Sequence, residues 1–218
     1  MRRCAAPPNR VMRFRPAIVV LAAGRGSRFD AARHKLEQPF GASTVLGTTL
    51  RNAIQTQLPV VLVTSEVLAP LAARQLARRD TVVLSPADAA RGMGATIATG
   101  VAERSGALGW LILPADMPLV KPSSLLAVAG ALEQHPIAFA QHRGRRGHPV
   151  GFSAELYSEL IVLEGDEGAR RLLARYPAHG VELEDRGVLV DIDTEAELQQ
   201  ARALAGEAAD AAAVGAAR

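Results

Sequence analysis

Five short apolar segments recur along the chain, and they constrain the fold more than any other feature of the sequence. Each segment is continuously apolar, as expected for a strand that is covered on both faces, and stretches compatible with helix lie between them. This alternation predicts an α/β fold, a Rossmann-like, doubly wound and mostly parallel sheet in a single domain. The expected strands are 18–22, 60–63, 81–84, 110–113 and 137–140, and the expected helices are 44–57, 66–79, 94–103, 123–134, 154–163 and 167–176.

The flanking and C-terminal segments complete this prediction. Residues 141–151 are rich in Gly, Arg, His and Pro and are expected to form a loop. Segments 181–184 and 188–192 are expected to be strands, and a last helix is expected from Glu195. The predicted organisation is a disordered basic tail (1–16), one domain (17–206) and an alanine-rich tail (207–218) that frays.

Composition excludes several classes of protein. At 218 residues and 49% hydrophobic content, the chain suits one domain. The single cysteine, Cys4, excludes a disulfide framework and a cysteine zinc site, and a cytoplasmic location is expected. The net charge of +3 comes from five arginines before residue 17, and aromatic residues make up only 4%, so a nucleic-acid partner is not expected. No apolar stretch approaches the roughly 20 residues of a membrane span, so no membrane partner is expected either.

The first apolar segment leads into a loop that suits a phosphate group. Gly24 and Gly26 let backbone N–H groups approach an anion closely, and Arg25, Arg28 and Lys35 supply positive charge. Only two of the 25 basic residues are lysines, and one of them is Lys35 beside this loop. A nucleoside triphosphate is the expected ligand.

Two well-known phosphate loops do not fit this spacing. The dinucleotide-binding fingerprint needs a third glycine where the chain has Phe29, which disfavours a nucleotide-dependent oxidoreductase. The P-loop needs its lysine much closer than Lys35, which lies eleven residues after Gly24 and precedes Leu36. Taken alone, the glycine pair is also compatible with an ordinary turn between a strand and a helix.

Aspartates follow two of the expected strands at the edge where ligands of such sheets bind. Asp116 follows strand 110–113 between two prolines, and the alternative is a turn aspartate bonded to its own backbone. Asp191 and Asp193 lie at the end of strand 188–192, where period-two alternation would put both on one face. Thr194 and Glu197 form a capping box for the last helix, so neither aspartate is needed as a cap. Asp116 with Asp191 or Asp193 could hold Mg²⁺ against a triphosphate.

Three further segments carry polar groups whose function the pattern alone leaves open. Gly92 and Gly94 precede one helix, and Asp166 and Arg170 open another; both helix starts suit anions, or ordinary capping with Asp166 as the N-cap. The basic segment 142–149 is either a solvated loop or a clamp for an anionic second substrate. The histidines at 34, 142 and 148 lack the spacing of a zinc site.

Taken together, these segments resemble the nucleotidyltransferases of molybdenum cofactor maturation (MobA-like NTP transferases), and most closely their CTP-dependent cytidylyltransferase branch. They occur in the family's order between residues 17 and 205. The matching segments are Leu21-Ala22-Ala23-Gly24 with Arg28 and Lys35, Gly92-Met93-Gly94, Asp116-Met117-Pro118, Gly147-His148-Pro149-Val150, 165–170 and Asp191-Ile192-Asp193-Thr194.

The resemblance implies a nucleotide-diphospho-sugar transferase-like fold and transfer of CMP from CTP to the terminal phosphate of molybdopterin or the molybdenum cofactor. The products would be the cytosine dinucleotide cofactor and pyrophosphate, the cofactor Mg²⁺, and a further partner a recipient molybdoenzyme. Ala23 and His148-Pro149 resemble the cytidylyl branch, whereas Asp30 stands where the family usually has glycine. The implied sites are nucleotide-binding Leu21, Ala22, Ala23, Gly24, Arg25, Gly26, Lys35, Gly92 and Gly94; catalytic Arg28, Lys35 and Asp116; substrate-binding His148, Pro149, Asp166 and Arg170; and metal-binding Asp116 and Asp193.

The attacking group in this reaction would be a phosphate that is already anionic, so no general base is required. Arg25, Arg28 and Lys35 would then hold the β and γ phosphates. Two alternatives remain at this stage: a guanylyltransferase that uses GTP on the same pterin, and a non-catalytic carrier of the molybdenum cofactor.

Overall fold

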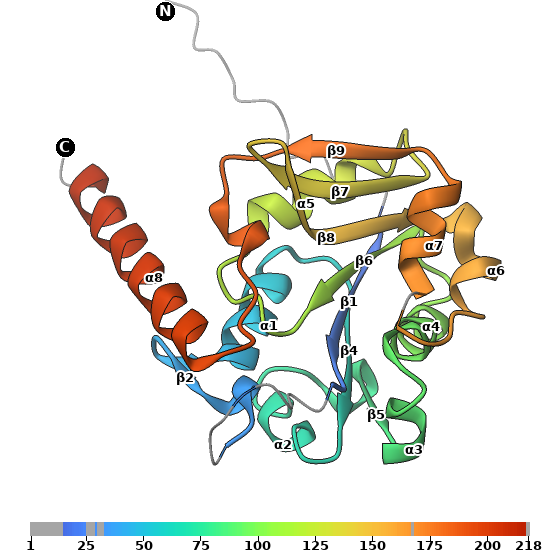
Figure 1. The fold of residues 1–218 in the computed structure, drawn as a ribbon, viewed down its shortest axis with the longest axis horizontal. Coiled ribbons are helices and arrows are strands. Elements are labelled where there is room, and N and C mark those ends of the chain that lie inside the picture. Colours follow the sequence, from blue (N-terminus) through green and yellow to red (C-terminus); the bar gives the residue numbers. More distant parts are fainter. Residues whose placement is uncertain (1–14, 25–28, 30–32, 167, 217–218) are drawn as a thin grey trace, which may run out of the picture.

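A seven-stranded mixed sheet forms the centre of the molecule (Figure 1). The structure is a computed structural model that describes residues 15–24, 29, 33–166 and 168–216. The strand order is β5-β4-β1-β6-β8-β7-β9. Of the residues that the sequence assigns to the phosphate loop, Arg25, Gly26 and Arg28 lie outside the described residues, as do Asp30 and the tail 1–14.

Four parallel strands form one half of the sheet, as predicted. β1 (Ala17–Ala22) pairs with β4 (Val60–Ser65) and β6 (Gly109–Pro114), and β4 pairs with β5 (Thr81–Leu84). β1, β4 and β6 are almost entirely buried, because helices cover both of their faces. The carboxyl ends of β1 and β6 therefore meet at one edge of the sheet.

The other half of the sheet differs from the prediction. Most of the predicted loop 141–151 is β8 (Arg145–Ser153), which runs antiparallel to β6 and to β7 (Ile137–His142); β9 (Ala178–Glu182) then adds parallel to β7. Arg143 and Gly144 have positive φ angles of 50° and 75° and form the tight turn that joins β7 to β8. The sequence analysis missed this strand because the polar residues and glycines of β8 are typical of a loop.

The second predicted strand of the C-terminal pair, 188–192, is not a strand. The segment begins with a 3₁₀ helix, η4 (Arg186–Leu189), and continues as extended chain outside the sheet. Buried Asp185 begins η4 and accepts hydrogen bonds from the backbone N–H of Gly187 and Lys121 and from the Ser124 hydroxyl. These hydrogen bonds attach the segment to the start of α5, so it packs on the sheet without adding to it.

Helices cover both faces of the sheet. Ile18 and Val20 of β1 face a cluster with α1 (Val45–Gln55), α5 (Pro122–Ala131) and the start of α8, while Val19 faces α4 (Met93–Glu103), α6 (Tyr157–Leu160) and α7 (Gly168–Arg175). The fold is therefore a single-domain, mostly parallel α/β sandwich, as predicted.

The shorter elements are η1 (Lys35–Glu37), β2 (Pro39–Phe40), β3 (Ser43–Thr44), α2 (Ala69–Ala72), η2 (Arg78–Asp80), α3 (Pro86–Ala89) and η3 (Ala154–Leu156).

The predicted helix 66–79 needs correction. It is reduced to α2 and η2, with Pro70 in the first turn of α2, where its missing N–H costs no helical hydrogen bond. α8 (Glu195–Ala216) extends into the alanine-rich segment 207–218. Alanine is the best helix former, which explains the length. Among the described residues, no helix combines the length and apolar character needed to cross a membrane.

η4 lies directly against β8 at Gly147, where there is no room for a side chain. A Cβ atom at Gly147 would collide with the carbonyl group of Val188. This close approach brings the segment that carries Asp191 and Asp193 beside His148 on β8.

We predict that Gly147→Ala destabilises the fold by about 1–3 kcal/mol, the usual range for overpacking a buried contact. Gly106→Ala is the matched control, because nothing lies within 4 Å of a Cβ atom there and its φ is not in the left-handed region. Urea unfolding of both variants measures the difference, and equal stabilities would contradict the close approach.

Candidate functional site

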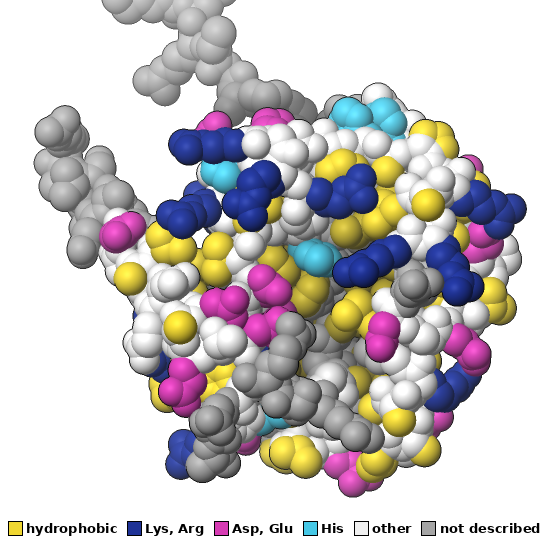
Figure 2. Space-filling view, in the orientation of Figure 1, with side chains coloured by type: hydrophobic (Ala, Val, Ile, Leu, Met, Phe, Trp, Pro, Cys, Tyr) yellow, Lys and Arg dark blue, Asp and Glu magenta, His cyan; other side chains and the backbone are white. Residues whose placement is uncertain are grey.

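A cleft of about 1340 Å³ opens beyond the carboxyl ends of β1 and β6. Figure 2 shows this hollow with acidic side chains on one side, basic side chains around the other and a histidine between them. Pro149 is buried and is not among the residues that line the cleft, so direct substrate binding by its side chain is not supported. The predicted residues that do line it are Leu21, Ala22, Ala23, Gly24, Lys35, Gly92, Gly94, Asp116, His148, Asp166, Arg170 and Asp193.

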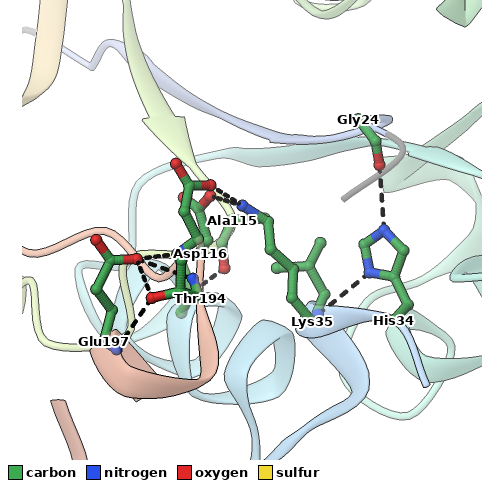
Figure 3. Close-up of polar contacts among 10 residues, drawn as sticks. Gly24, His34, Lys35, Ala115, Asp116, Thr194 and Glu197 are labelled. Atoms are coloured by element: carbon green, nitrogen blue, oxygen red, sulfur yellow. Dashed lines mark hydrogen bonds and ion pairs between the residues drawn. The ribbon is translucent and has the colours of Figure 1, made fainter. Parts of the chain in front are cut away.

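Lys35 bridges the two aspartates assigned to the metal. Its ammonium lies 2.6 Å from Asp116 Oδ2 and 2.7 Å from Asp193 Oδ1, and all three side chains are less than 20% exposed (Figure 3). The sequence placed Lys35 on the triphosphate, so this contact is a difference from the prediction. Burial lowers the pKa of Lys35, but the Asp116 charge and the hydrogen bonds that the ammonium donates to both carboxylates together raise the pKa above its usual value. The ammonium is therefore charged at neutral pH.

Asp116 is placed by backbone contacts around the end of β6. The Thr49 hydroxyl donates to the Ala115 carbonyl at 2.9 Å, and the Ile192 N–H donates to the Asp116 carbonyl at 3.1 Å. Among the described residues, buried Asp116 Oδ1 has no hydrogen-bond partner. An unsatisfied carboxylate oxygen beside a second carboxylate is a donor set that fits a hard divalent cation, which prefers oxygen ligands.

Asp193 is placed by the start of α8. Glu197 Oε2 accepts hydrogen bonds from the N–H groups of Asp193 and Thr194 at 2.9 and 2.8 Å, and the Thr194 hydroxyl accepts from the Glu197 N–H at 3.3 Å. The predicted capping box is thus confirmed, although the argument that a strand puts Asp191 and Asp193 on one face is wrong. Asp193 contacts Lys35, whereas Asp191 is exposed at the cleft wall and its charge acts on His148.

His34 is a site residue that the sequence reasoning missed. The ring Nδ1 of His34 accepts from the Leu36 N–H at 3.2 Å, and the backbone N–H of His34 donates to Glu37 Oε2 at 3.1 Å. The ring Nε2 lies 3.2 Å from the Gly24 carbonyl (Figure 3). These contacts cap η1 and attach it to the phosphate loop, so they fix the stem of Lys35. A glutamate three residues after His34 was the available signal, because it follows the spacing of a capping box.

Gly92 and Gly94 have a structural role beside the expected nucleotide contact. The Gly94 N–H donates to the Gly165 carbonyl at 2.7 Å, and a Cβ atom on either glycine would lie within 3 Å of the backbone of 164–165. Asp166 Oδ1 accepts from the Met93 N–H at 3.1 Å. Asp166 therefore caps the start of α4, a role that the sequence did not assign to it, because the two loops pack together.

Basic residues form the opposite rim of the cleft. The Arg146 guanidinium lies 4.1 Å from the centre of the Phe139 ring, which holds it at the cleft wall, and Arg170 lines the same cleft. Burial lowers the pKa of His148 below its ordinary value of 6.5, despite the opposing charges of Asp116 and Asp191. His148 is therefore neutral at neutral pH, and the arginines carry the positive charge on this side.

Comparison with known proteins identifies the family to which the chain belongs. The MobA-like NTP transferase domain family matches residues 18–181. The purine catabolism protein PucB of Bacillus subtilis (strain 168) is 34% identical over 197 residues, which cover 84% of this chain and 94% of PucB. The molybdenum cofactor cytidylyltransferase of Escherichia coli (strain K12) is 24% identical over 176 residues, covering 81% of this chain and 90% of that protein.

Solved structures show the same arrangement of strands and helices. The crystal structure of Rv0371c from Mycobacterium tuberculosis H37Rv superposes with a TM-score of 0.74 at 27% identity, covering 86% of this chain and 98% of that chain. Its complex with manganese superposes with a TM-score of 0.70 at 26% identity, covering 85% and 97%. From the family match and these relatives, the chain belongs to the MobA-like NTP transferase family and is a nucleotidyltransferase.

Proposed function

We propose that this nucleotidyltransferase transfers CMP from CTP to the terminal phosphate of molybdopterin or the molybdenum cofactor, with Mg²⁺ as its cofactor. The observation that carries the proposal is the convergence of Asp116, Asp193 and Lys35 beside the end of β1. Two carboxylates and one lysine that line the same cleft as Gly24 are groups that a metal–triphosphate complex needs.

Asp116 and Asp193 would hold Mg²⁺, which supplies neutralisation of charge on the α-phosphate when it is bound. Gly24 with Arg25, Gly26 and Arg28 would hold the β and γ phosphates; the last three lie outside the described residues and stay predictions. Gly92 and Gly94 would complete the nucleotide side of the cleft.

The opposite rim suits the second substrate. The pterin phosphate is anionic at neutral pH and attacks without a general base, so this side must lower repulsion between two anions and hold them in line. Arg146 and Arg170 supply positive charge at the cleft wall. Neutral His148 supplies a hydrogen-bonding ring without adding charge.

The choice of CTP rests on sequence similarity. Ala23 gives the Ala-Ala-Gly sequence that resembles the cytidylyl branch, and the similar Escherichia coli protein is a molybdenum cofactor cytidylyltransferase. The similarity to PucB favours a recipient molybdoenzyme that acts in purine catabolism. Guanylyl transfer is the second candidate. A carrier without activity is disfavoured because Asp116, Asp193 and Lys35 are all present.

We predict that pyrophosphate is released only when CTP, and not GTP or ATP, is supplied with Mg²⁺ and the molybdenum cofactor. Activity with GTP alone would show that GTP, and not CTP, is the nucleotide substrate.

Asp116→Asn should lower turnover by about a hundredfold or more, the scale for losing one preorganised electrostatic group. Circular dichroism of this variant checks that the fold is intact. Near-normal turnover of Asp116→Asn would contradict the assignment of Asp116 to the active site.

We predict that Arg146→Gln raises KM for the pterin substrate by about tenfold or more and leaves KM for CTP unchanged, because a charge-assisted hydrogen bond to a phosphate is lost. Arg145→Gln is the matched control. Arg145 is the preceding, exposed residue of β8 and does not line the cleft. Steady-state kinetics with each substrate varied in turn separates the two KM values, and equal behaviour of the two variants would contradict the assignment of Arg146.

A further inference from the structure

Lys35 contacts both carboxylates that would hold a divalent cation. Its ammonium lies 2.6 Å from Asp116 Oδ2 and 2.7 Å from Asp193 Oδ1, one oxygen on each, while Asp116 Oδ1 has no hydrogen-bond partner among the described residues. Mg²⁺ binds its oxygen ligands at about 2.1 Å, so a metal held by both carboxylates would lie within a few ångströms of the ammonium. Two unit charges of the same sign a few ångströms apart repel by several kcal/mol at the effective dielectric constant of a protein site.

The net charge of this cluster differs between the state with Lys35 bound to the aspartates and the state with a metal bound to them. Two carboxylates and one ammonium leave the cluster with one net negative charge. A divalent cation between the same carboxylates neutralises the pair, and the displaced ammonium then needs a new anionic partner in a partly buried site. A triphosphate at the adjacent glycine loop is such a partner.

The backbone around Lys35 is held in place, so the ammonium would move from the aspartates to a new partner by rotation of the side chain alone. Leu36 is 3% exposed and packs in the core, and the capping box of His34 and Glu37 fixes η1. The His34 ring also contacts the Gly24 carbonyl, so the stem of Lys35 is connected to the residue at which the predicted phosphate loop begins. Gly24 and Lys35 line the same cleft.

We propose that Lys35 is a resident cation that competes with the divalent metal for Asp116 and Asp193, so that the metal binds tightly only together with a nucleoside triphosphate whose phosphates receive the ammonium. The proposal rests on the proposed nucleotidyl transfer at this site. It assigns Lys35 two alternating partners and makes the nucleotide and the metal bind cooperatively, because each removes an obstacle to the other.

NMR of the unaltered protein tests the exchange directly. The chain has only two lysines, Lys35 and Lys121, so ¹⁵Nζ labelling of lysine gives two side-chain signals, and Lys121→Met assigns them. Lys121 is exposed and its ammonium lies 3.4 Å from the Glu184 carbonyl, away from the aspartates. We expect the Lys35 signal to stay in place with millimolar Mg²⁺ alone and to shift when α,β-methylene-CTP is added with Mg²⁺. An equal shift with Mg²⁺ alone would overturn the proposal.

Metal affinity gives a second test that does not depend on activity. Electron paramagnetic resonance of free Mn²⁺ measures binding without nucleotide, and we expect Lys35→Met to bind Mn²⁺ at least about tenfold more tightly than the unaltered protein. Lys121→Met should leave the affinity unchanged, and adding Asp193→Asn to Lys35→Met should remove the gain. Equal or weaker Mn²⁺ binding by Lys35→Met would overturn the competition.

The two tests separate this proposal from the proposed function. A gain in Mn²⁺ affinity without any response of Lys35 to α,β-methylene-CTP would overturn the coupling of the metal to the nucleotide through Lys35, and would leave nucleotidyl transfer to be judged by pyrophosphate release. Failure of Lys35→Met to gain affinity, with CTP-dependent pyrophosphate release intact, would overturn the competition alone.

Discussion

The Lys35 ammonium connects three parts of the chain that are far apart in sequence. Asp116 lies 81 residues from Lys35 and Asp193 lies 158 residues from it, yet both carboxylates contact the same ammonium. Taking these charges out of water is unfavourable, and only the mutual attraction and hydrogen bonds repay the cost. Convergence therefore requires the fold to place the end of β6, the start of α8 and η1 accurately, and each has its own backbone contacts for this.

The parallel half of the sheet was predictable because burial leaves a local signal. β1, β4, β5 and β6 are continuously apolar or nearly so, and their lengths separate them from the helices. β8 was missed because its arginines, glycines and proline match a loop pattern, although its partners β6 and β7 supply the hydrogen bonds. The segment 188–192 was mistaken for a strand because the hydrogen bonds of Asp185 that redirect it come from distant residues.

The candidate site was predictable at the level of residues but not of contacts. Asp116 was identified as a carboxylate after a strand and Lys35 as a rare lysine, whereas the pattern left Asp191 and Asp193 open and the family resemblance pointed to Asp193. The direct contact of Lys35 with Asp116 and Asp193 was not predictable, because it depends on the path of three separate loops. Asp166 and the glycines of 92–94 show the same limit: the sequence identifies a helix start, but only the packing of two loops shows that Asp166 caps α4.

The division of charge across the cleft would allow the proposed site to bring two anions together. The acidic wall, Asp116 and Asp193, favours a cation that can accompany a triphosphate, while Arg146 and Arg170 on the opposite rim favour a phosphate without a metal. Burial keeps His148 between them neutral, so neither wall cancels the other. If the two walls were mixed, the arginines would pair with the aspartates and neither anion would find a charged partner. Lys35, which contacts both aspartates, does so through a long, rotatable side chain, which would leave that pairing reversible.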